Sequence, residues 1–321
     1  MHKKTTHTHY IYAGFILFLL IVPLLTTEIY FIHIFCLIGI NIIFACSIQT
    51  ILNIGELNFA QAGFMGIGAY ATTLFVMKLH ISFWLAMPAA VIITAIASLP
   101  IGFLTLRFKG AYFLLFTFLF AELIRIVLSN FWIDIFGGIP GLTNIPSPSI
   151  NIPGILKITF DSAVHFYYLI LVLTLFTVFF LRRLDKSTMG MVLKAIGQSD
   201  ILAESVGINC MKFKVMICAV GCLFAGLAGS LYAPFVGIIT PYDFSTHAIL
   251  LPIAYVVIGG TESVYGPVVG TVILMILSNL FLRQLGLYEM LIYGLIIVFV
   301  VRFMPGGLIS MPSRFSLRKK G

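Results

Sequence analysis

The interval Arg182–Lys214 reads RRLDKSTMGMVLKAIGQSDILAESVGINCMKFK and separates two long apolar runs. Within it, Ser199 or Asp200 can act as a helix N-cap, and Gly207 can adopt the left-handed conformation that ends a helix. This pattern predicts a helix of about two turns over Ile201–Val206. A helix this short is not stable alone in water, so it must lie against a surface. Its apolar and acidic residues indicate a surface helix that this chain shares with a partner.

The composition around this interval is that of a membrane protein. Of the 321 residues, 60% are hydrophobic and 9% are charged, whereas roughly 25% of the residues of a soluble protein are charged. The net charge of +8 does not indicate nucleic-acid binding, because the basic residues form no patch interleaved with aromatic residues. Their positions follow the ends of the apolar runs instead.

The apolar runs predict an all-α, polytopic membrane protein with about ten transmembrane segments, since most runs approach the roughly 20 residues that a bilayer crossing requires. The runs are Tyr10–Thr27, Ile29–Leu52, Leu57–Leu79, Ile81–Leu106, Ala111–Asn130, Val164–Leu181, Phe213–Phe235, Thr246–Ile258, Val264–Leu282 and Leu287–Val301. We expect residues 1–9 to form a cytoplasmic tail, residues 10–304 the transmembrane domain and residues 305–321 a basic cytoplasmic tail.

The positive charges orient the chain. With a cytoplasmic N-terminus and ten crossings, most lysines and arginines fall on the cytoplasmic side, and only Lys78, Lys157 and Arg283 fall outside. Both termini and the loop 182–214 are then cytoplasmic. The loop 131–163, rich in Gly, Pro, Ser and Asn, becomes the one sizeable external loop, which either docks an external partner or is a passive connector.

Two places interrupt the apolar runs. The segment Asn53–Gly68 carries too many polar side chains for a lipid-facing helix, and irregular backbone at membrane depth must be covered by protein or by a water-filled path. These side chains are Asn53, Glu56, Asn58 and Gln61. The run Thr246–Ile258 is short and is followed by glycines and a proline, which is typical of a discontinuous helix at a transport path. Paired interruptions of this kind indicate a repeat-based transporter.

One predicted helix, Ala111–Asn130, carries two ionisable residues three positions apart. Glu122 and Arg125 can pair on one face of this helix. An ionisable pair inside a membrane span is either a structural ion pair or part of a transport path. The sequence leaves both interpretations open.

Motifs of soluble catalysis are absent from the sequence. It contains no GxxxxGK(S/T) phosphate loop, no HExxH, no CxxC and no GxSxG. Cys218 and Cys222 share a helix face but would need further ligands to hold a metal, so we expect small core residues and neither a metal nor a cofactor. The sequence therefore favours transport, conduction or scaffolding over an enzyme.

The segment Lys194–Asn209, KAIGQSDILAESVGIN, resembles the cytoplasmic loop of ABC importer permeases, in which an acidic residue, small residues and a glycine form the coupling helix. The remainder resembles the branched-chain amino acid permeases, in particular their M-type (LivM-like) subunits. The similar pieces occur in the family's order over most of the chain. They are Leu52–Gly55, Ala60–Tyr70, Leu106–Tyr112, Ala121–Arg125, Gly137–Pro146 and Val257–Pro267.

This resemblance implies an importer in the inner membrane of a bacterium. An external binding protein would deliver the solute, a second permease subunit would pair with this chain, and two separate ATPase subunits would drive alternating access. The residues expected to couple to the ATPase are Lys194, Ala195, Ser199, Asp200, Ala203, Glu204, Gly207 and Asn209. The residues expected along the substrate path are Asn53, Asn58, Gln61, Glu122, Glu262 and Tyr265.

Alternatives remain at the level of the sequence. The solute is a branched-chain amino acid or instead urea, an amide or another small molecule. The chain is otherwise an ion-coupled secondary transporter or a channel, in which Glu122 with Arg125, or Glu262, carries a proton or an ion. A receptor or scaffold has less support, because no segment is large enough for an external ligand-binding domain.

Overall fold

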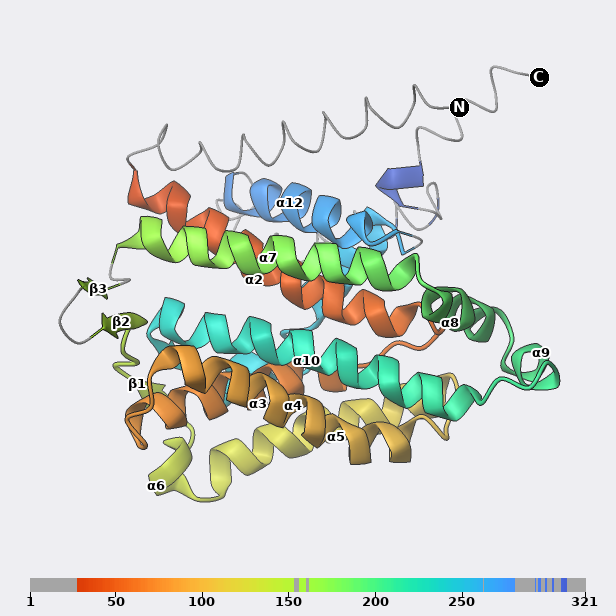
Figure 1. Cartoon of the computed structure of the whole chain (residues 1–321), viewed down its shortest axis with the longest axis horizontal. Coiled ribbons are helices and arrows are strands. Elements are labelled where there is room, and N and C mark those ends of the chain that lie inside the picture. The colour runs from red at the N-terminus through yellow and green to blue at the C-terminus, as the bar shows by residue number, and fades with distance from the viewer. Residues whose placement is uncertain are drawn as a thin grey trace, which may run out of the picture.

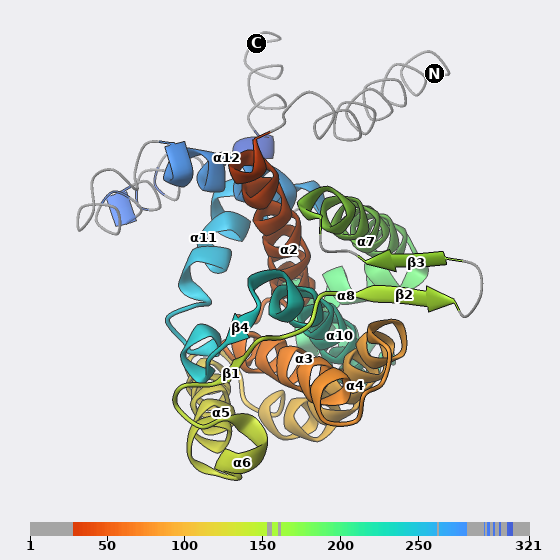
Figure 2. The same cartoon turned by 90° about the vertical axis from the view of Figure 1, so that its left-hand side faces the viewer.

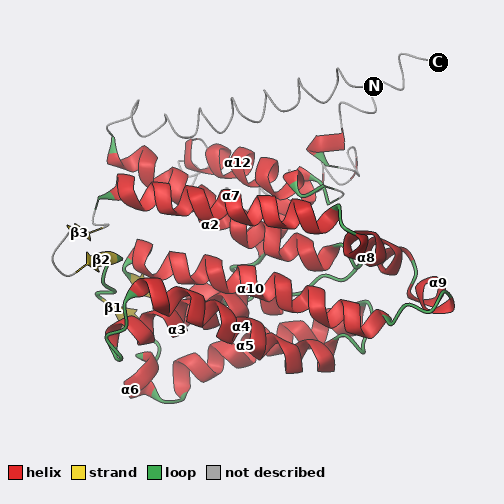
Figure 3. Ribbon diagram, viewed as in Figure 1, coloured by secondary structure: helices red, strands yellow, loops and turns green. Residues whose placement is uncertain are grey.

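The computed structural model describes residues 28–152, 156–159, 162–261 and 263–280, together with 292, 294, 295, 298, 302 and 307–310. This part of the chain is predominantly helical (Figure 3), and six of its helices are long and apolar enough to cross a membrane. They are α2 (Ile29–Leu52), α3 (Ala60–Met77), α4 (Phe83–Thr105), α5 (Ala111–Asn130), α7 (Ala163–Asp185) and α10 (Cys210–Val236). Two shorter helices, α11 (Leu250–Gly259) and α12 (Tyr265–Leu280), follow them.

The helices agree with most of the predicted runs. Ile29–Leu52 and Ala111–Asn130 were predicted with the bounds that α2 and α5 have. The first and last predicted segments, Tyr10–Thr27 and Leu287–Val301, lie wholly or largely outside the described residues, so the number of crossings stays a prediction. A single turn of 3-10 helix, η3 (Leu308–Ser310), is described near the C-terminus.

The centre of the bundle consists of α2, α3 and α10, and the long helices run roughly side by side (Figures 1 and 2). Helices α3 and α10 approach closely because glycines face backbone. A Cβ atom on Gly68 would collide with the backbone of Gly226, and one on Gly229 would collide with the carbonyl of Met65. Gly68 and Gly229 therefore allow the backbones of α3 and α10 to lie in direct contact.

One end of the bundle carries short elements that the all-α prediction did not include. They are α6 (Ile133–Phe136), β1 (Leu142–Thr143), β2 (Ser149–Ile152), β3 (Leu156–Thr159) and β4 (Ile238–Ile239). Strand β2 pairs with β3, and β1 pairs with β4 in antiparallel register, Leu142 opposite Ile239. Gly141 has a φ of +76°, and because it has no Cβ the loop 131–163 can pass close to the backbone of Ile239. Strands of two or four residues contain too little alternation of polar and apolar residues to be recognised, which is why the sequence did not predict them.

The chain from β4 to α12 contains the short helix. Thr240 and Asp243 form a reciprocal capping box at the start of the 3-10 helix η1 (Pro241–Phe244). The predicted run Thr246–Ile258 becomes α11, which begins only at Leu250 and spans ten residues, about 15 Å of helix. This length is too short to cross a bilayer core of about 30 Å.

The opposite end of the bundle carries α8 (Thr188–Gln198) and α9 (Asp200–Ser205) (Figure 1). The sequence predicted α9, within one residue at each end, but not α8. Ser187 is the N-cap of α8, and its Oγ accepts a hydrogen bond from the backbone N–H of Gly190 at 3.3 Å. It buries Gly190, Leu193 and Ile196 against the bundle.

Candidate functional site

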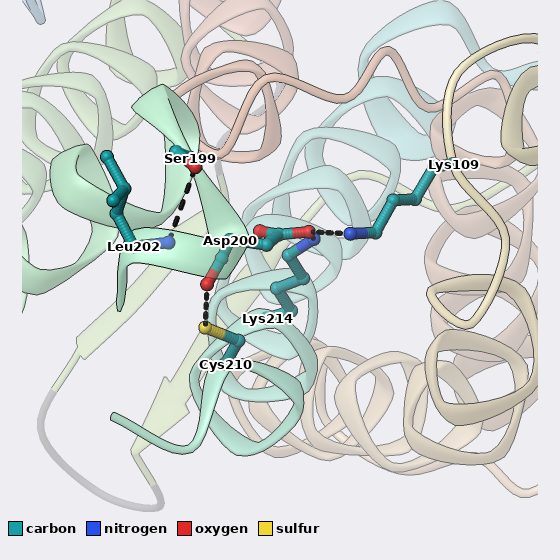
Figure 4. Close-up of polar contacts among 6 residues, drawn as sticks. All are labelled: Lys109, Ser199, Asp200, Leu202, Cys210 and Lys214. Carbon is teal, nitrogen blue, oxygen red and sulfur yellow. Dashed lines mark hydrogen bonds and ion pairs between the residues drawn. The ribbon is translucent and has the colours of Figure 1, made fainter. Parts of the chain in front are cut away.

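Helix α9 has a defined start and a defined end. The backbone of Ser199 is extended, and its Oγ accepts a hydrogen bond from the N–H of Leu202 at 3.4 Å (Figure 4). Gly207 has a φ of +85°, and the N–H of Ile208 donates to the carbonyl of Ala203 at 3.1 Å. Asn209 then caps α10 by accepting from the N–H of Lys212 at 3.1 Å. The N-cap of α9 is therefore Ser199, and the side chain of Asp200 does not cap the helix.

The two sides of α9 differ in burial. Ala203 is 3% exposed and packs in a small apolar cluster with Ile196 and Cys210. On the other side Ile201, Leu202 and Val206 are 76%, 69% and 74% exposed. Burying an aliphatic side chain of this size stabilises by about 1.5 to 3 kcal/mol. The outer face of this two-turn helix therefore carries exposed apolar side chains that no other part of the described chain covers.

Asp200 binds two ammonium groups. Its Oδ2 lies 2.6 Å from Nζ of Lys109 and 2.8 Å from Nζ of Lys214 (Figure 4). The side chains of Lys214 and Asp200 are 6% and 13% exposed, whereas that of Lys109 is 62% exposed. The buried carboxyl of Glu56 interacts electrostatically with all three groups and accepts a hydrogen bond from the N–H of Gly110. We call Glu56, Lys109, Asp200 and Lys214 the Asp200 cluster.

The Asp200 cluster shifts the proton affinities of its members. Burial raises the pKa of Asp200, but the hydrogen bonds from Lys109 and Lys214 outweigh it and hold this pKa below its ordinary value. The hydrogen bond to Asp200 raises the pKa of Lys109. Burial raises the pKa of Glu56 above its ordinary value, although Lys214 and the Gly110 N–H lower it. The cluster thus favours an ionised Asp200 and opposes an ionised Glu56.

The residues predicted for coupling all lie at this end of the bundle. Lys194 and Ala195 are exposed on α8, and Nζ of Lys194 pairs with Oδ1 of Asp185 at 2.7 Å. Glu204 is exposed on α9, and a Cβ on Gly207 would meet open space. The remaining members have the roles described above. Ser199 caps α9 and Asn209 caps α10. Asp200 forms the ion pairs, and Ala203 makes the buried contact with Ile196.

The residues predicted for the substrate path do not converge. Asn53 ends α2, with its carbonyl against Gly197 of α8, and Tyr265 begins α12, with the guanidinium of Arg182 5.5 Å from its ring centroid. Both therefore lie near the α8 and α9 end. Glu262 falls outside the described residues.

Asn58 and Gln61 have local roles at the start of α3. Oδ1 of Asn58 accepts a hydrogen bond from the N–H of Ala60 at 2.9 Å, which explains why α3 begins three residues after the start of the predicted run Leu57–Leu79. Nε2 of Gln61 donates to the carbonyl of Ser47 at 3.1 Å. The Oε1 atom of Gln61 is buried and has no hydrogen-bond partner among the described residues.

Glu122 makes the predicted pair and a second contact. Its Oε2 lies 2.6 Å from Nε of Arg125, and its Oε1 accepts a hydrogen bond from Oγ1 of Thr246 at 2.8 Å. Thr246 is buried in the segment that leads from η1 into α11. Glu122 therefore joins α5 to the start of the short helix. Whether this carboxylate also contacts a solute stays a prediction.

From the sequence, Lys109 and Lys214 were predicted only to lie on the cytoplasmic side. Nothing in their local sequence marks them as partners of Asp200, because Lys109 is far from Asp200 along the chain and Lys214 lies beyond a loop. The only available signal was a charged residue at the edge of an apolar run.

Six long apolar helices with a capped polar connection at one end define a multi-pass helical membrane protein. Residues 30–301 match the model of the family described as branched-chain amino acid transport system / permease component, so the chain belongs to that family. This confirms the predicted ABC permease of the branched-chain amino acid type, a transport subunit.

Two relatives are both named high-affinity branched-chain amino acid transport system permease protein LivM. The protein of Salmonella typhimurium strain LT2 is 28% identical over 292 residues, which cover 85% of this chain and 67% of the relative. The protein of Escherichia coli strain K12 has the same identity and coverage. No solved structure matches the chain.

Proposed function

We propose that α9 is the helix through which a separate ATPase subunit drives import by this permease. The outward side chains of Ile201, Leu202 and Val206, on a helix fixed by Ser199 and by the Asp200 cluster, carry this proposal. A rigid helix with an apolar outer face fits a groove on another protein, as amphipathic helices do in general. The matching family is a permease component, and the sequence of this chain has no phosphate loop, which supports ATP hydrolysis on another chain.

The other proposed partners follow from the same family. They are a second ATPase subunit, a second permease subunit and an external solute-binding protein; no nucleic acid is involved. The solute is a branched-chain amino acid, in keeping with the description of the family and the names of the relatives. The loop 131–163, which β1 and β4 join to the bundle at the end opposite α9, is the proposed contact for the binding protein.

The proposed orientation puts α8 and α9 in the cytoplasm of a bacterial cell, with both termini on that side of the inner membrane. It rests on the basic residues at this end, because positive charge favours the cytoplasmic side. These include Lys109, Arg182, Arg183, Lys186, Lys194 and Lys212. The domain bounds 1–9, 10–304 and 305–321 remain part of this proposal, as do ten crossings.

For the substrate path we retain Asn58, Gln61 and Glu122, because Asn58 and Gln61 are buried and Glu122 contacts the segment before α11. Asn53 and Tyr265 would contribute only near its cytoplasmic opening. Ion-coupled transport has less support, since both carboxylate oxygens of Glu122 already bind partners within the chain.

Co-purification from detergent-solubilised native membranes tests the role of α9. We expect the intact chain to retain an ATPase subunit and a second permease subunit. Leu202→Glu should lose the ATPase but keep the second permease, because it introduces a charge into the outer face of α9. Met191→Glu is the matched control, since Met191 is also an exposed apolar residue but lies on α8. An intact chain that retains no ATPase, or a Leu202→Glu variant that retains it fully, would contradict the proposal.

A further inference from the structure

Helix α9 is connected to three parts of the bundle. Ala203 packs against Ile196 of α8. The ion pair of Asp200 with Lys214 joins α9 to α10, and the ion pair of Asp200 with Lys109 joins α9 to the turn between α4 and α5. The ion pair with Lys109 was not expected, because this turn is distant from α9 in the sequence. Helix α5 begins at Ala111, two residues after Lys109. A displacement of Asp200 therefore acts directly on the first turn of α5.

Helix α5 carries a second polar contact further along its length. Glu122 accepts the hydrogen bond from Thr246, in the segment that leads into α11. The pair with Arg125 on the same helix, 2.6 Å from Nε to Oε2, fixes the carboxylate in position. The two contacts, Asp200 with Lys109 and Glu122 with Thr246, thus lie at the start and beyond the middle of one helix.

We propose that α5 transmits the movement of α9 to the short helix α11, with Lys109 and Asp200 as positioning residues at one contact and Glu122 and Thr246 at the other. The inference rests on the proposed role of α9. It goes further because it selects α5 as the connecting span, and it names the two polar contacts that join this span to α9 and α11. Lys109, Asp200 and Thr246 act in this way without touching the solute or the nucleotide, whereas Glu122 is also one of the proposed path residues.

The charges of the Asp200 cluster favour movement as a unit. Two carboxylates and two ammonium groups from four segments share a site in which Glu56 and Lys214 are buried. Separating Asp200 from Lys214 would leave a buried ammonium without this partner, so α9 and the start of α10 move together. Lys109 binds the same Oδ2 atom at 2.6 Å, and this contact carries the displacement to the turn before α5.

The test uses the complete transporter in vesicles, with both permease subunits, the ATPases and the binding protein. Radiolabelled leucine is the probe, and the measured quantity is leucine imported per ATP hydrolysed. We expect Lys109→Ala to lower this ratio by roughly three- to tenfold, as a mutation along a coupling route does. Lys109→Arg should restore it, because a guanidinium can also bind Asp200. Lys212→Ala is the matched control: Lys212 is an exposed lysine nearby, and its side chain makes no ion pair in the described part of the chain.

A double-mutant cycle decides whether the two contacts act in series. Thr246→Val should lower the same ratio, and Lys109→Ala combined with Thr246→Val should be no worse than the more severe single variant. Independent contacts would instead multiply their effects, and that result would overturn the series arrangement through α5. An unchanged ratio in Lys109→Ala, with the ATPase still bound, would overturn the inference but leave the role of α9 intact. Failure of the intact chain to retain an ATPase would overturn both.

Discussion

Asp200 of α9 and Lys214 of α10 form an ion pair of 2.8 Å in which the lysine side chain is almost wholly buried. A buried ammonium is tolerated only when a carboxylate compensates its lost hydration. The second lysine on the same oxygen, Lys109, is mostly exposed and is compensated by water. The ion pairs of Asp200 with Lys214 and with Lys109 therefore differ in what they contribute to stability, although both use Oδ2 of Asp200.

The first prediction concerns this difference. Asp200→Asn should lower the free energy of unfolding by about 3 kcal/mol, because it leaves the buried Lys214 ammonium without its partner. Lys109→Ala should cost less than about 1 kcal/mol, because an exposed ion pair contributes little. Thermal and denaturant unfolding in a mild detergent measures both. Equal losses of unfolding free energy in the two variants would contradict the conclusion that Lys214 is the buried partner of Asp200.

The second prediction is a pH dependence with two signs. The pKa of Glu56 is raised in the folded state, so its stabilising contribution is full below its ordinary value of 4.5 and is lost as the pH rises through the folded pKa. The pKa of Asp200 is lowered, so its contribution is present above 3.8 and is lost as the pH falls through the folded pKa. Above pH 4.5 we therefore expect a decline due to Glu56 that is missing in Glu56→Gln, measured as the unfolding temperature against pH. A decline that persists in Glu56→Gln would refute this assignment.

The third prediction tests the close approach of α3 and α10. Gly229→Ala should destabilise the protein by about 1 to 3 kcal/mol, because its Cβ would collide with the backbone carbonyl of Met65. Gly102→Ala is the control on α4. There a Cβ would lie 3.4 Å from Sγ of Cys218, an ordinary contact, so we expect no loss and a gain of up to about 1 kcal/mol from helix propensity. Unfolding in detergent compares the two variants.

The fourth prediction concerns the hydrogen bond between α5 and the segment before α11. Thr246→Val keeps the shape of the side chain and the backbone hydrogen bond from Thr246 to Glu122, but it removes the hydroxyl donor. We expect a loss of about 1.5 kcal/mol, typical of a hydrogen bond to a charged group. Thr73→Val is the matched control. The hydroxyl of Thr73 donates only to the carbonyl of Ala69 in the same helix. When this hydroxyl is removed, the carbonyl of Ala69 still accepts its helical backbone hydrogen bond. The control variant should lose less, and the opposite order would count against the contact.

Much of the bundle follows from the sequence because long apolar runs have few alternatives in a bilayer. The capped helix after Ser199 was also predictable, since a capping residue and a terminal glycine act over a few positions. Helix α8 was missed because its apolar face, Gly190, Leu193 and Ile196, is sparse inside a polar interval. Its stability comes from the surface beneath it, which the local sequence does not contain.

The site was less predictable than the fold for the same reason. Ser199 or Asp200 was expected to cap α9, and Ser199 does so. Asp200 binds Lys109 and Lys214, which only the packed bundle brings to it. Asn53 and Tyr265 were expected along a path because of their polarity, although they lie near α8. Polarity in an apolar run indicates that a side chain has a partner. It does not identify that partner.

The ladder between β1 and β4 also has a consequence for the order in which the protein is made. Strand β1 is synthesised after α5, but its partner Ile238–Ile239 leaves the ribosome only after α7, α8, α9 and α10. The backbone groups of Leu142 and Thr143 must therefore wait for the insertion of two further long helices before they can pair. Formation of this short ladder marks the completion of the central bundle during synthesis, and a chain that stops before Ile238 leaves the edge of β1 unpaired.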